Sequence, residues 1–221
     1  MAEAAGRRER KKRQTRARIQ DAALELFAEH GFRQTTVAAI AERADVATRT
    51  VAVHFPAKED LLFADDPFTP SSLGRRLALR TPGESTLDAL RDWMVTTMRE
   101  LDAEAAAGSG DGAPIWRRRA IRLRLVVDDD DLSGRARAGY RDLEKLVAAG
   151  VGQDLDLAAD ALIPRLAAIT TVAGLREIYA TSEAKAAEGM TELIPLVDRV
   201  LDFARAGIAA QPTSTAADRT S

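Results

Sequence analysis

Cysteine is absent from the 221-residue chain, and histidine is nearly so, with only His30 and His54. Without thiols the chain has no disulfide framework, no thiolate zinc site and no cysteine nucleophile. Two histidines are too few for a histidine-rich metal centre. The sequence also shows no nucleophile–base pair and no phosphate-binding loop. We therefore expect a protein that is not an enzyme and that holds no metal and no cofactor.

Long apolar runs are also missing, since none approaches the roughly 18–20 residues that a membrane span requires. The N-terminus begins polar and turns basic, with no apolar segment behind it that would form a signal peptide. These features predict a cytoplasmic protein with no membrane partner. Hydrophobic residues make up 46% of the chain and charged residues 30%, which is typical of a globular protein.

The small net charge of −2 hides an uneven distribution. Residues 1–58 hold 12 basic and 7 acidic residues, a net of +5, which leaves the remainder at −7. Within residues 6–18 eight Lys and Arg face the single acid Glu9. Beside an element that contacts nucleic-acid bases, such a cluster would bind phosphates. In isolation it could equally be a solvated, partly disordered arm.

The pattern of the whole chain is helical, because Ala, Leu, Arg and Glu dominate and β-branched alternation is absent. We therefore predict an all-α fold. The turn-rich segment 65–70 marks a hinge. After it, we expect helices over about 71–80, 85–104, 114–127, 132–152, 156–182 and 189–209.

Before the hinge, a first amphipathic helix ends at Gly31, which is well placed for a left-handed cap. A short second helix follows Thr36, a good N-cap, and a turn at Asp45 leads to a third helix from about Thr48 to Phe55. A fourth helix is predicted to start near residues 57–58. The apolar residues expected in this core are Leu26, Phe27, Phe32, Ile40, Val51 and Phe55.

Residues 22–32 (AALELFAEHGF) and 35–62 (TTVAAIAERADVATRTVAVHFPAKEDLL) resemble the N-terminal domain of TetR-family transcriptional regulators. The resemblance covers about residues 12–63. It implies a three-helix helix-turn-helix unit whose third helix enters the DNA major groove. The residues that it and the basic arm suggest for DNA binding are Arg13, Arg16, Thr36, Thr48, Arg49, Thr50, His54 and Lys58.

These residues have distinct expected roles. The planar guanidinium of Arg49 can pair with guanine acceptors, and Thr48 and Thr50 can reach bases or phosphates. His54, which has a purely structural alternative, and Lys58, expected at the N-terminus of the fourth helix, would contact the DNA backbone.

Three positions depart from the family pattern. Asp45 stands where glycine is usual, and aspartate tolerates the left-handed conformation. Ala47 replaces a Ser or Thr cap, which costs about 1 kcal/mol unless Asp45 or Thr48 substitutes for it. Ala52 replaces a tyrosine that commonly contacts phosphate, which puts that contact in doubt.

We divide the chain into a basic arm (1–18) that runs into the first helix, a helix-turn-helix domain (12–64), a helical domain (71–209) and a disordered tail (210–221). The helical domain resembles the family's variable half, which holds an effector pocket and a dimer interface. It is similar to the mycofactocin-type subgroup, which is associated with fatty acyl-CoA effectors.

Large apolar and amphipathic residues on the central helices are candidates for binding the effector, or are plain core. They are Trp93, Met94, Met98, Trp116, Leu123, Tyr140 and Tyr179. The basic run of residues 117–119, 122 and 124 either holds an anionic effector or forms a solvated helix face.

Two apolar stripes near the C-terminus predict a homodimer built as a four-helix bundle, unless both stripes face the core of one chain. The residues expected at the interface are Leu162, Leu166, Ile169, Val172, Leu193, Val197, Val200 and Leu201.

The sequence thus predicts a ligand-responsive transcriptional regulator of the repressor type. As a homodimer it would bind a near-palindromic double-stranded DNA operator, and a small, largely apolar effector would release it. The alternative is a DNA-binding or protein-interaction module that works without an effector.

Overall fold

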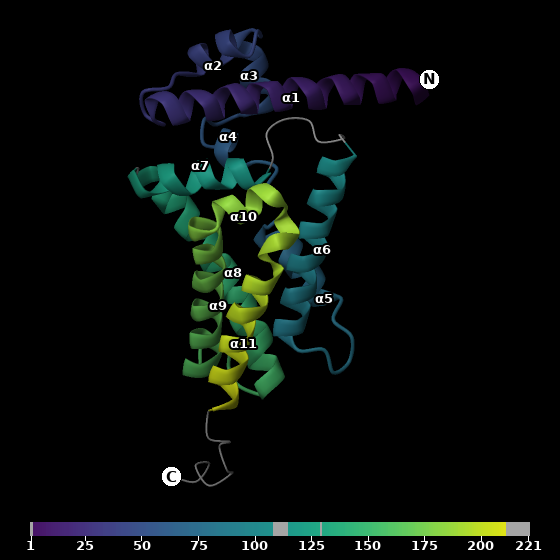
Figure 1. The fold of residues 1–221 in the computed structure, drawn as a ribbon, viewed down its shortest axis with the longest axis vertical. Helices are drawn as coiled ribbons and strands as arrows, with labels where there is room; N and C mark the ends of the chain where they lie inside the picture. Colours follow the sequence, from purple (N-terminus) through teal and green to yellow (C-terminus); the bar gives the residue numbers. More distant parts are fainter. Residues whose placement is uncertain (1, 108–114, 129, 211–221) are drawn as a thin grey trace.

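The computed structural model describes residues 2–107, 115–128 and 130–210, and each regular element in these ranges is a helix (Figure 1). The predicted all-α fold is therefore confirmed. Four helices form the N-terminal part, which we call the head (residues 2–64). They are α1 (Ala2–His30), α2 (Val37–Arg43), α3 (Thr48–His54) and α4 (Asp60–Phe63).

The helices that follow form the body (residues 70–210). They are α5 (Pro70–Ala78), α6 (Thr86–Ala106), α7 (Ile115–Asp128), α8 (Asp130–Leu155), α9 (Leu162–Thr181), α10 (Glu183–Glu188), the 3-10 turn η1 (Met190–Leu193) and α11 (Ile194–Ala209). The helix expected over 156–182 begins only at Leu162, because Asp156 adopts a positive φ of 54° and the chain turns there. The helix expected over 189–209 is divided between η1 and α11, and α10 was not predicted.

The head has a core of its own. Ile19, Phe27 and Ile40 are at most 1% exposed, as are Val51 and Leu61. Every residue that the sequence assigned to this core is buried. The fourth helix starts at Asp60 rather than at 57–58, because residues 57–59 form a turn in which the Asp60 carboxylate accepts the Ala57 N–H at 3.1 Å.

Helix α7 lies between the head and the other helices of the body (Figure 1). Ile121, Leu125 and Val126 of this helix pack against the head core, as does Leu132 at the start of α8, which is fully buried. Arg118 donates to the Gln20 side chain at 2.7 Å, and Gln20 donates to the Leu61 carbonyl at 3.2 Å. The body thus contacts both α1 and α4 of the head.

The rest of the body is a helical bundle with close backbone approaches. Gly174 of α9 lies so near to Val200 of α11 that a Cβ at this position would be 2.8 Å from a valine methyl group. Gly150 of α8 lies similarly close to Thr86 of α6. These approaches pin α9 to α11 and α8 to α6 within one chain.

Candidate nucleic-acid interface and ligand cavity

Local backbone interactions determine where α1 ends, where α2 begins and how the chain turns into α3. Gly31 ends α1 at φ 80°, and its N–H donates to the Phe27 carbonyl at 2.9 Å. The Thr36 hydroxyl caps α2 by accepting the Ala39 N–H at 3.1 Å, and Asp45 occupies the left-handed region at φ 51°. All three predictions are confirmed. Ala47 begins α3 without a side-chain cap, so neither Asp45 nor Thr48 substitutes for the missing hydroxyl.

Helix α3 buries one face and exposes the other. Val51 is 1% exposed and holds α3 against the head core, whereas Thr48 and Arg49 are exposed and Thr50 is half-buried. Val53, which the sequence analysis did not single out, is 71% exposed on the outward side. A valine methyl beside a guanidinium can contact a thymine methyl while the guanidinium pairs with guanine, so this face can read bases.

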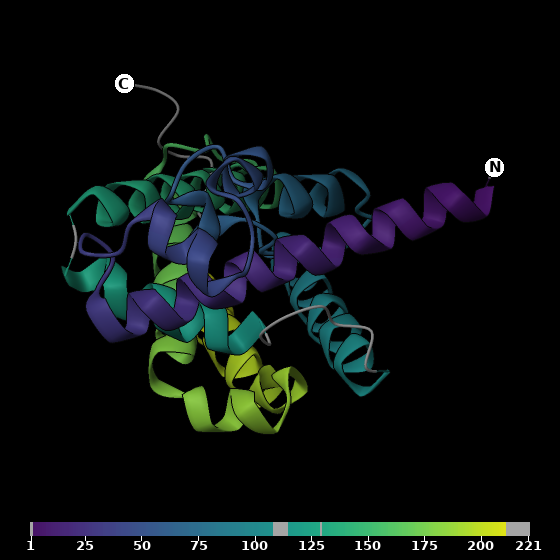
Figure 2. The ribbon, with the colours of Figure 1, turned by 90° about the horizontal axis from the view of Figure 1, so that it is seen from above.

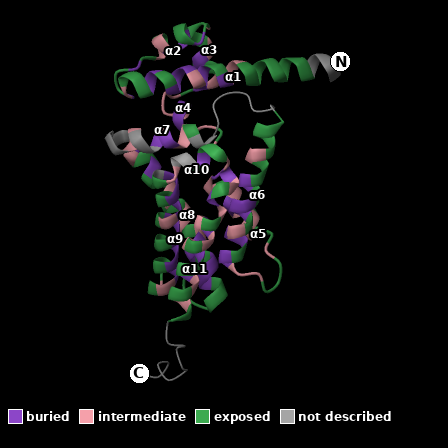
Figure 3. Ribbon diagram, viewed as in Figure 1, coloured by how far each residue is buried: buried purple, intermediate pink, exposed green. Residues whose placement is uncertain are grey.

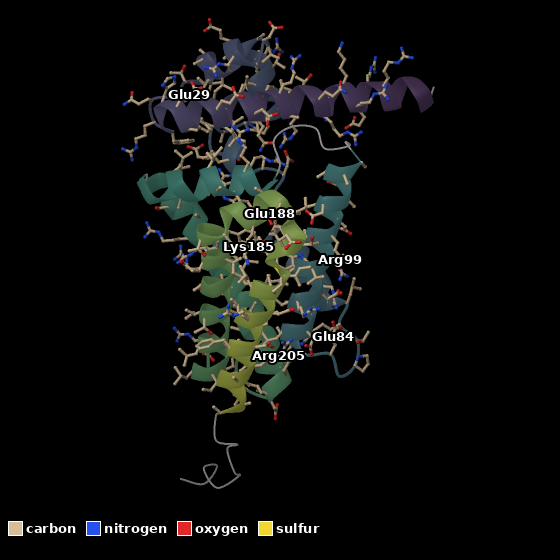
Figure 4. All side chains as sticks on the ribbon, in the orientation of Figure 1. Glu29, Glu84, Arg99, Lys185, Glu188 and Arg205 are labelled. Atoms are coloured by element: carbon tan, nitrogen blue, oxygen red, sulfur yellow. The ribbon has the colours of Figure 1, made fainter. Side chains whose placement is uncertain are left out.

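The basic arm is the N-terminal part of α1 and projects well beyond the remainder of the head (Figures 1 and 2). Figure 3 shows it as exposed, in contrast to the buried stripe of the second half of α1. Arg13 is exposed, as are the Lys and Arg residues at 7, 8, 10, 11, 12 and 18. In Figure 4 charged side chains surround this projection, and Glu29 marks the opposite end of the helix. The arm therefore offers a cationic surface to a polyanion.

Arg16 differs from the exposed arginines of the arm because it is used within the head. Its Nε lies 2.8 Å from an Asp65 carboxylate oxygen, and its Nη1 donates to the His54 carbonyl. Its guanidinium also lies 4.2 Å from the centre of the Phe55 ring. Arg16 thus ties α1 to the end of α3 and to the hinge.

His54 and Lys58 also make internal contacts. Burial lowers the pKa of His54, and the charges of Arg16 and Lys12 lower it further, so the imidazole is neutral at neutral pH. The Lys58 ammonium donates to the carbonyls of Phe32 and Thr35 at 2.8 and 3.0 Å, and it lies over the Phe32 ring. Lys58 lies in the turn that leads directly into α4, where its carbonyl accepts the Leu61 N–H at 3.2 Å. Its main structural role is to hold the loop that leads into α2.

A cavity of about 180 Å³ lies inside the body, beneath the hinge. Trp93, Met94, Tyr140 and Tyr179 line it, and all four were candidates for effector binding. Met98 is fully buried in the core and is not part of the lining. Trp116 and Leu123 lie on α7, but their side chains fall outside the described residues.

A buried ion-pair cluster connects this cavity to the hinge. Asp66 accepts from Arg119 and from Arg122, each at 2.7 Å, and from the Phe68 N–H at 3.0 Å. The three charged side chains are only 9–12% exposed. Burial alone would raise the pKa of Asp66, but the two guanidiniums and the N–H outweigh it and hold the pKa below the ordinary value. Arg119 and Arg122 are thus not a solvated helix face.

The Arg119 guanidinium lies against two aromatic rings that also contact each other, with 6.1 Å between their centres. Its central carbon lies 4.1 Å from the Tyr179 ring centre and 4.7 Å from that of Phe68. Phe68 in turn meets Trp93 edge to face at 5.6 Å between ring centres. The aromatic rings of the cavity are therefore packed on the cluster that connects it to the hinge.

The C-terminal apolar stripes are only partly available for a partner. Leu162, Leu166 and Ile169 are 44–67% exposed. Phe203, which the sequence did not point to, is 71% exposed. The prediction was wrong for four residues, which are at most 8% exposed inside the core of one chain: Val172, Leu193, Val197 and Leu201. Val200 is half-buried against Gly174. Core and interface residues share the same helical period, so the sequence could not separate them.

The described residues bring together no group of three or more His, Cys, Asp or Glu that could hold a metal ion. In the same ranges, no helix is both long and apolar enough to cross a membrane.

Comparison with known proteins agrees with this geometry. Residues 19–64 match the sequence model of the family described as "Bacterial regulatory proteins, tetR family". Residues 84–209, more than half of the chain, match the model of the "MftR C-terminal domain". The chain belongs to the TetR family. The second match also confirms the predicted mycofactocin-type subgroup.

Individual relatives are more distant. The chain is 29% identical over 157 residues to the HTH-type transcriptional regulator TcmR of Streptomyces glaucescens. That match covers 68% of this chain and 66% of TcmR, just under two thirds of the relative's length.

Two solved structures share the fold of this TetR-family chain. NalD, the secondary repressor of the MexAB-OprM multidrug efflux pump in Pseudomonas aeruginosa, is 20% identical with a TM-score of 0.62, over 87% of this chain and 96% of NalD. The SmeT–triclosan complex, whose protein is the Stenotrophomonas maltophilia efflux-pump repressor, is 22% identical with a TM-score of 0.58, over 86% and 90%.

Three features of this TetR-family chain were not found from its sequence. Val53 could have been found from the period of α3, because two residues beyond the buried Val51 a side chain faces outward. Phe203 follows Val200 by one turn and so extends the stripe on α11. Asp66 had no local signal, because its partners lie about fifty residues later in the chain.

Proposed function

We propose that this TetR-family chain is a ligand-responsive transcriptional repressor that binds a near-palindromic operator as a homodimer. The observation that carries the proposal is the outward face of α3, where Arg49 and Val53 are exposed beside the cationic arm. Arg49 and Val53 would read bases, and Thr48 and Thr50 would contact bases or phosphates. Arg13 and the rest of the arm would bind phosphates without sequence preference.

The other expected contacts have supporting roles. Thr36 caps α2 and keeps its hydroxyl at the exposed end of that helix, where a phosphate contact is compatible with capping. Arg16, His54 and Lys58 would position α3 and α2 through their internal hydrogen bonds.

A second copy would pack on the exposed residues of α9 and α11. Leu166, Ile169 and Phe203 are large apolar side chains that water reaches in one chain alone, and pairing the helices in a four-helix bundle would cover them. Such a dimer must hold its two α3 helices about 34–36 Å apart, or at a multiple suited to the operator.

The cavity would receive the effector, and the Asp66 cluster would transmit its binding. A ligand between Trp93 and Tyr179 touches the rings that hold Arg119, whose carboxylate partner Asp66 lies in the hinge below α4. A ligand that favours a shifted hinge would change the separation of the two α3 helices and so lower operator affinity. The cavity of about 180 Å³ suits a small apolar molecule; an acyl-CoA would require it to open further.

A DNA selection experiment tests the proposal. The full-length protein is incubated with random duplexes, the bound DNA is sequenced, and affinity for the selected site is measured with Phe203→Glu and Arg205→Glu as matched variants. We expect two inverted half-sites, and a dimer for the unmodified protein by light scattering. Phe203→Glu should give a monomer with weaker binding, whereas Arg205→Glu lies outside the apolar stripe and should still dimerise. Selection of no common sequence would contradict the proposal.

Thermal-shift screening separates the effector-independent alternative. Stabilisation by hydrophobic drugs or acyl-CoAs, together with release of the selected site, supports a ligand-responsive repressor. Sustained operator binding with no hit in the screen would favour a module that works without an effector.

A further inference from the structure

The wall of the cavity carries an excess of positive charge. Its lining includes Arg119, Arg122, Arg135 and Arg176 but only one carboxylate, Asp66. Arg135 is offset by Asp60 outside the lining, at 2.6 Å. Arg119 and Arg122 share Asp66, and Arg176 has no ion pair among the described residues. Arg135 and Arg176 are exposed to water, whereas Arg119 and Arg122 are buried and share one carboxylate, so a bound anion would balance the second buried guanidinium.

Two buried polar atoms in this wall have no hydrogen-bond partner within the described part of the chain. They are the Tyr179 hydroxyl and the Arg119 Nε, which belong to stacked side chains. An unsatisfied buried polar atom is costly, so such an atom in a cavity wall points to a missing partner. The described residues contain only three other buried side-chain atoms of this kind.

The chemistry of these two atoms restricts the partner. A guanidinium N–H can only donate, so the group that meets Arg119 must be an acceptor. Burial raises the pKa of Tyr179 to about 12, which keeps its hydroxyl protonated and able to donate at neutral pH. A carboxylate accepts from both donors, and hydrogen bonds to an ionised acceptor are the stronger kind.

We propose that the effector is a compact apolar acid, whose carboxylate is bound by the Tyr179 hydroxyl and Arg119 and whose body lies against Trp93, Met94 and Leu90. The proposal rests on the ligand-responsive function proposed above and names the chemical class of the ligand. The entering carboxylate would accept from the Nε of Arg119, whose Nη1 donates to Asp66, so both carboxylates would act on one guanidinium. Binding of the acid would therefore change the ion pair between Arg119 and Asp66 of the hinge.

The test compares an acid with its uncharged isostere. Binding of 2-naphthoate and of 2-naphthamide to the full-length protein is measured by titration calorimetry at pH 7, with decanoate as an acid whose body is aliphatic. We expect 2-naphthoate to bind at least about tenfold more tightly than 2-naphthamide, because only the acid gains charge-assisted hydrogen bonds. Decanoate decides whether the cavity prefers an aromatic or an aliphatic body. Equal affinity for acid and amide, or no binding of either acid, overturns the proposal.

A tyrosine variant tests the assigned donor. Tyr179→Phe keeps the ring that stacks on Arg119 and removes only the hydroxyl, so it should fold with an unchanged midpoint of thermal unfolding. It should weaken 2-naphthoate binding about tenfold and leave 2-naphthamide binding nearly unchanged. Tyr140→Phe removes the other tyrosine hydroxyl of the cavity, which is not buried without a partner, and should have a smaller effect on the acid. An equal loss in both variants, or no loss in Tyr179→Phe, overturns the role of Tyr179.

Operator release separates this proposal from the one on which it rests. If acid and amide release the selected DNA equally well, the protein is ligand-responsive and the acid-specific proposal fails. If 2-naphthoate binds with the expected preference but no cavity ligand releases the DNA, the acid site stands and the ligand-responsive function fails.

Discussion

Arginine is used in opposite ways in the head and in the body. On the arm and on α3 it is exposed, as at Arg13 and Arg49. On α7, Arg119 and Arg122 are almost as buried as core residues and are paired with Asp66. An exposed guanidinium is available to a phosphate or a base, whereas a buried one must be satisfied within the fold. Arginine content therefore says little about function until burial is known.

Two neighbouring aspartates at the hinge show the same contrast between exposed and buried charge. Asp65 pairs with Arg16 at the surface, where its side chain is 48% exposed, and its neighbour Asp66 pairs with two arginines in the interior. Two adjacent aspartates thus form one exposed and one buried ion pair. The same substitution at each position therefore compares the two kinds of pair.

The largest effect is expected for Asp66→Asn. The change leaves two guanidiniums buried without a carboxylate, so the free energy of unfolding should fall by about 3–5 kcal/mol, as measured by urea denaturation. The same change at the neighbouring position, Asp65→Asn, should cost less than about 1 kcal/mol because the pair is exposed. Similar losses in the two variants would remove the distinction between buried and exposed pairs.

The pH dependence of this difference has a defined sign. Because the folded pKa of Asp66 is lowered, its contribution is complete above the ordinary aspartate pKa of about 3.9 and is lost as the pH falls through the folded value. The stability gap between the unmodified protein and Asp66→Asn should be constant near neutral pH and narrow in acid. A gap that widens on acidification would contradict the assigned pKa direction.

An intermediate effect is expected for Arg49→Ala on α3. Loss of one base contact should cost about 1–3 kcal/mol of operator affinity per half-site and relax the sequence preference there. Val53→Ala should relax preference for thymine more weakly. Arg43→Ala is the matched control, because Arg43 is exposed but paired with Glu25 and Glu29 on α1. If Arg43→Ala and Arg49→Ala alter DNA sequence preference alike, α3 is not the reading helix.

The sequence was sufficient where a short segment determines its own geometry. Gly31, Thr36 and Asp45 could be assigned because a cap or a turn depends on one residue and its immediate neighbours. The same holds for the core of the head, whose apolar residues repeat with the helical period.

Where partners are distant along the chain, local patterns could not decide. The basic run on α7 looks alike at every position, yet Arg117 is exposed while Arg119 is buried against Asp66, 53 residues earlier. Likewise, Val197 and Phe203 both lie on the apolar helix α11, but only the first meets the core of its own chain. Tertiary packing determines which of these side chains are buried, and the helical period of the sequence does not show it.

The smallest effect is expected for single cations of the arm. The arm places its positive charge at the N-terminus of α1, where the helix dipole is already unfavourable for cations, so phosphates of DNA would relieve it. Arg13→Ala should lower operator and nonspecific affinity alike and reduce the slope of log affinity against log salt by about one for each phosphate that the variant no longer binds. Gln14→Ala, on the same exposed stretch but uncharged, should leave that slope unchanged. A salt slope that Arg13→Ala does not alter would show that the arm, although exposed and basic, does not bind DNA through this residue.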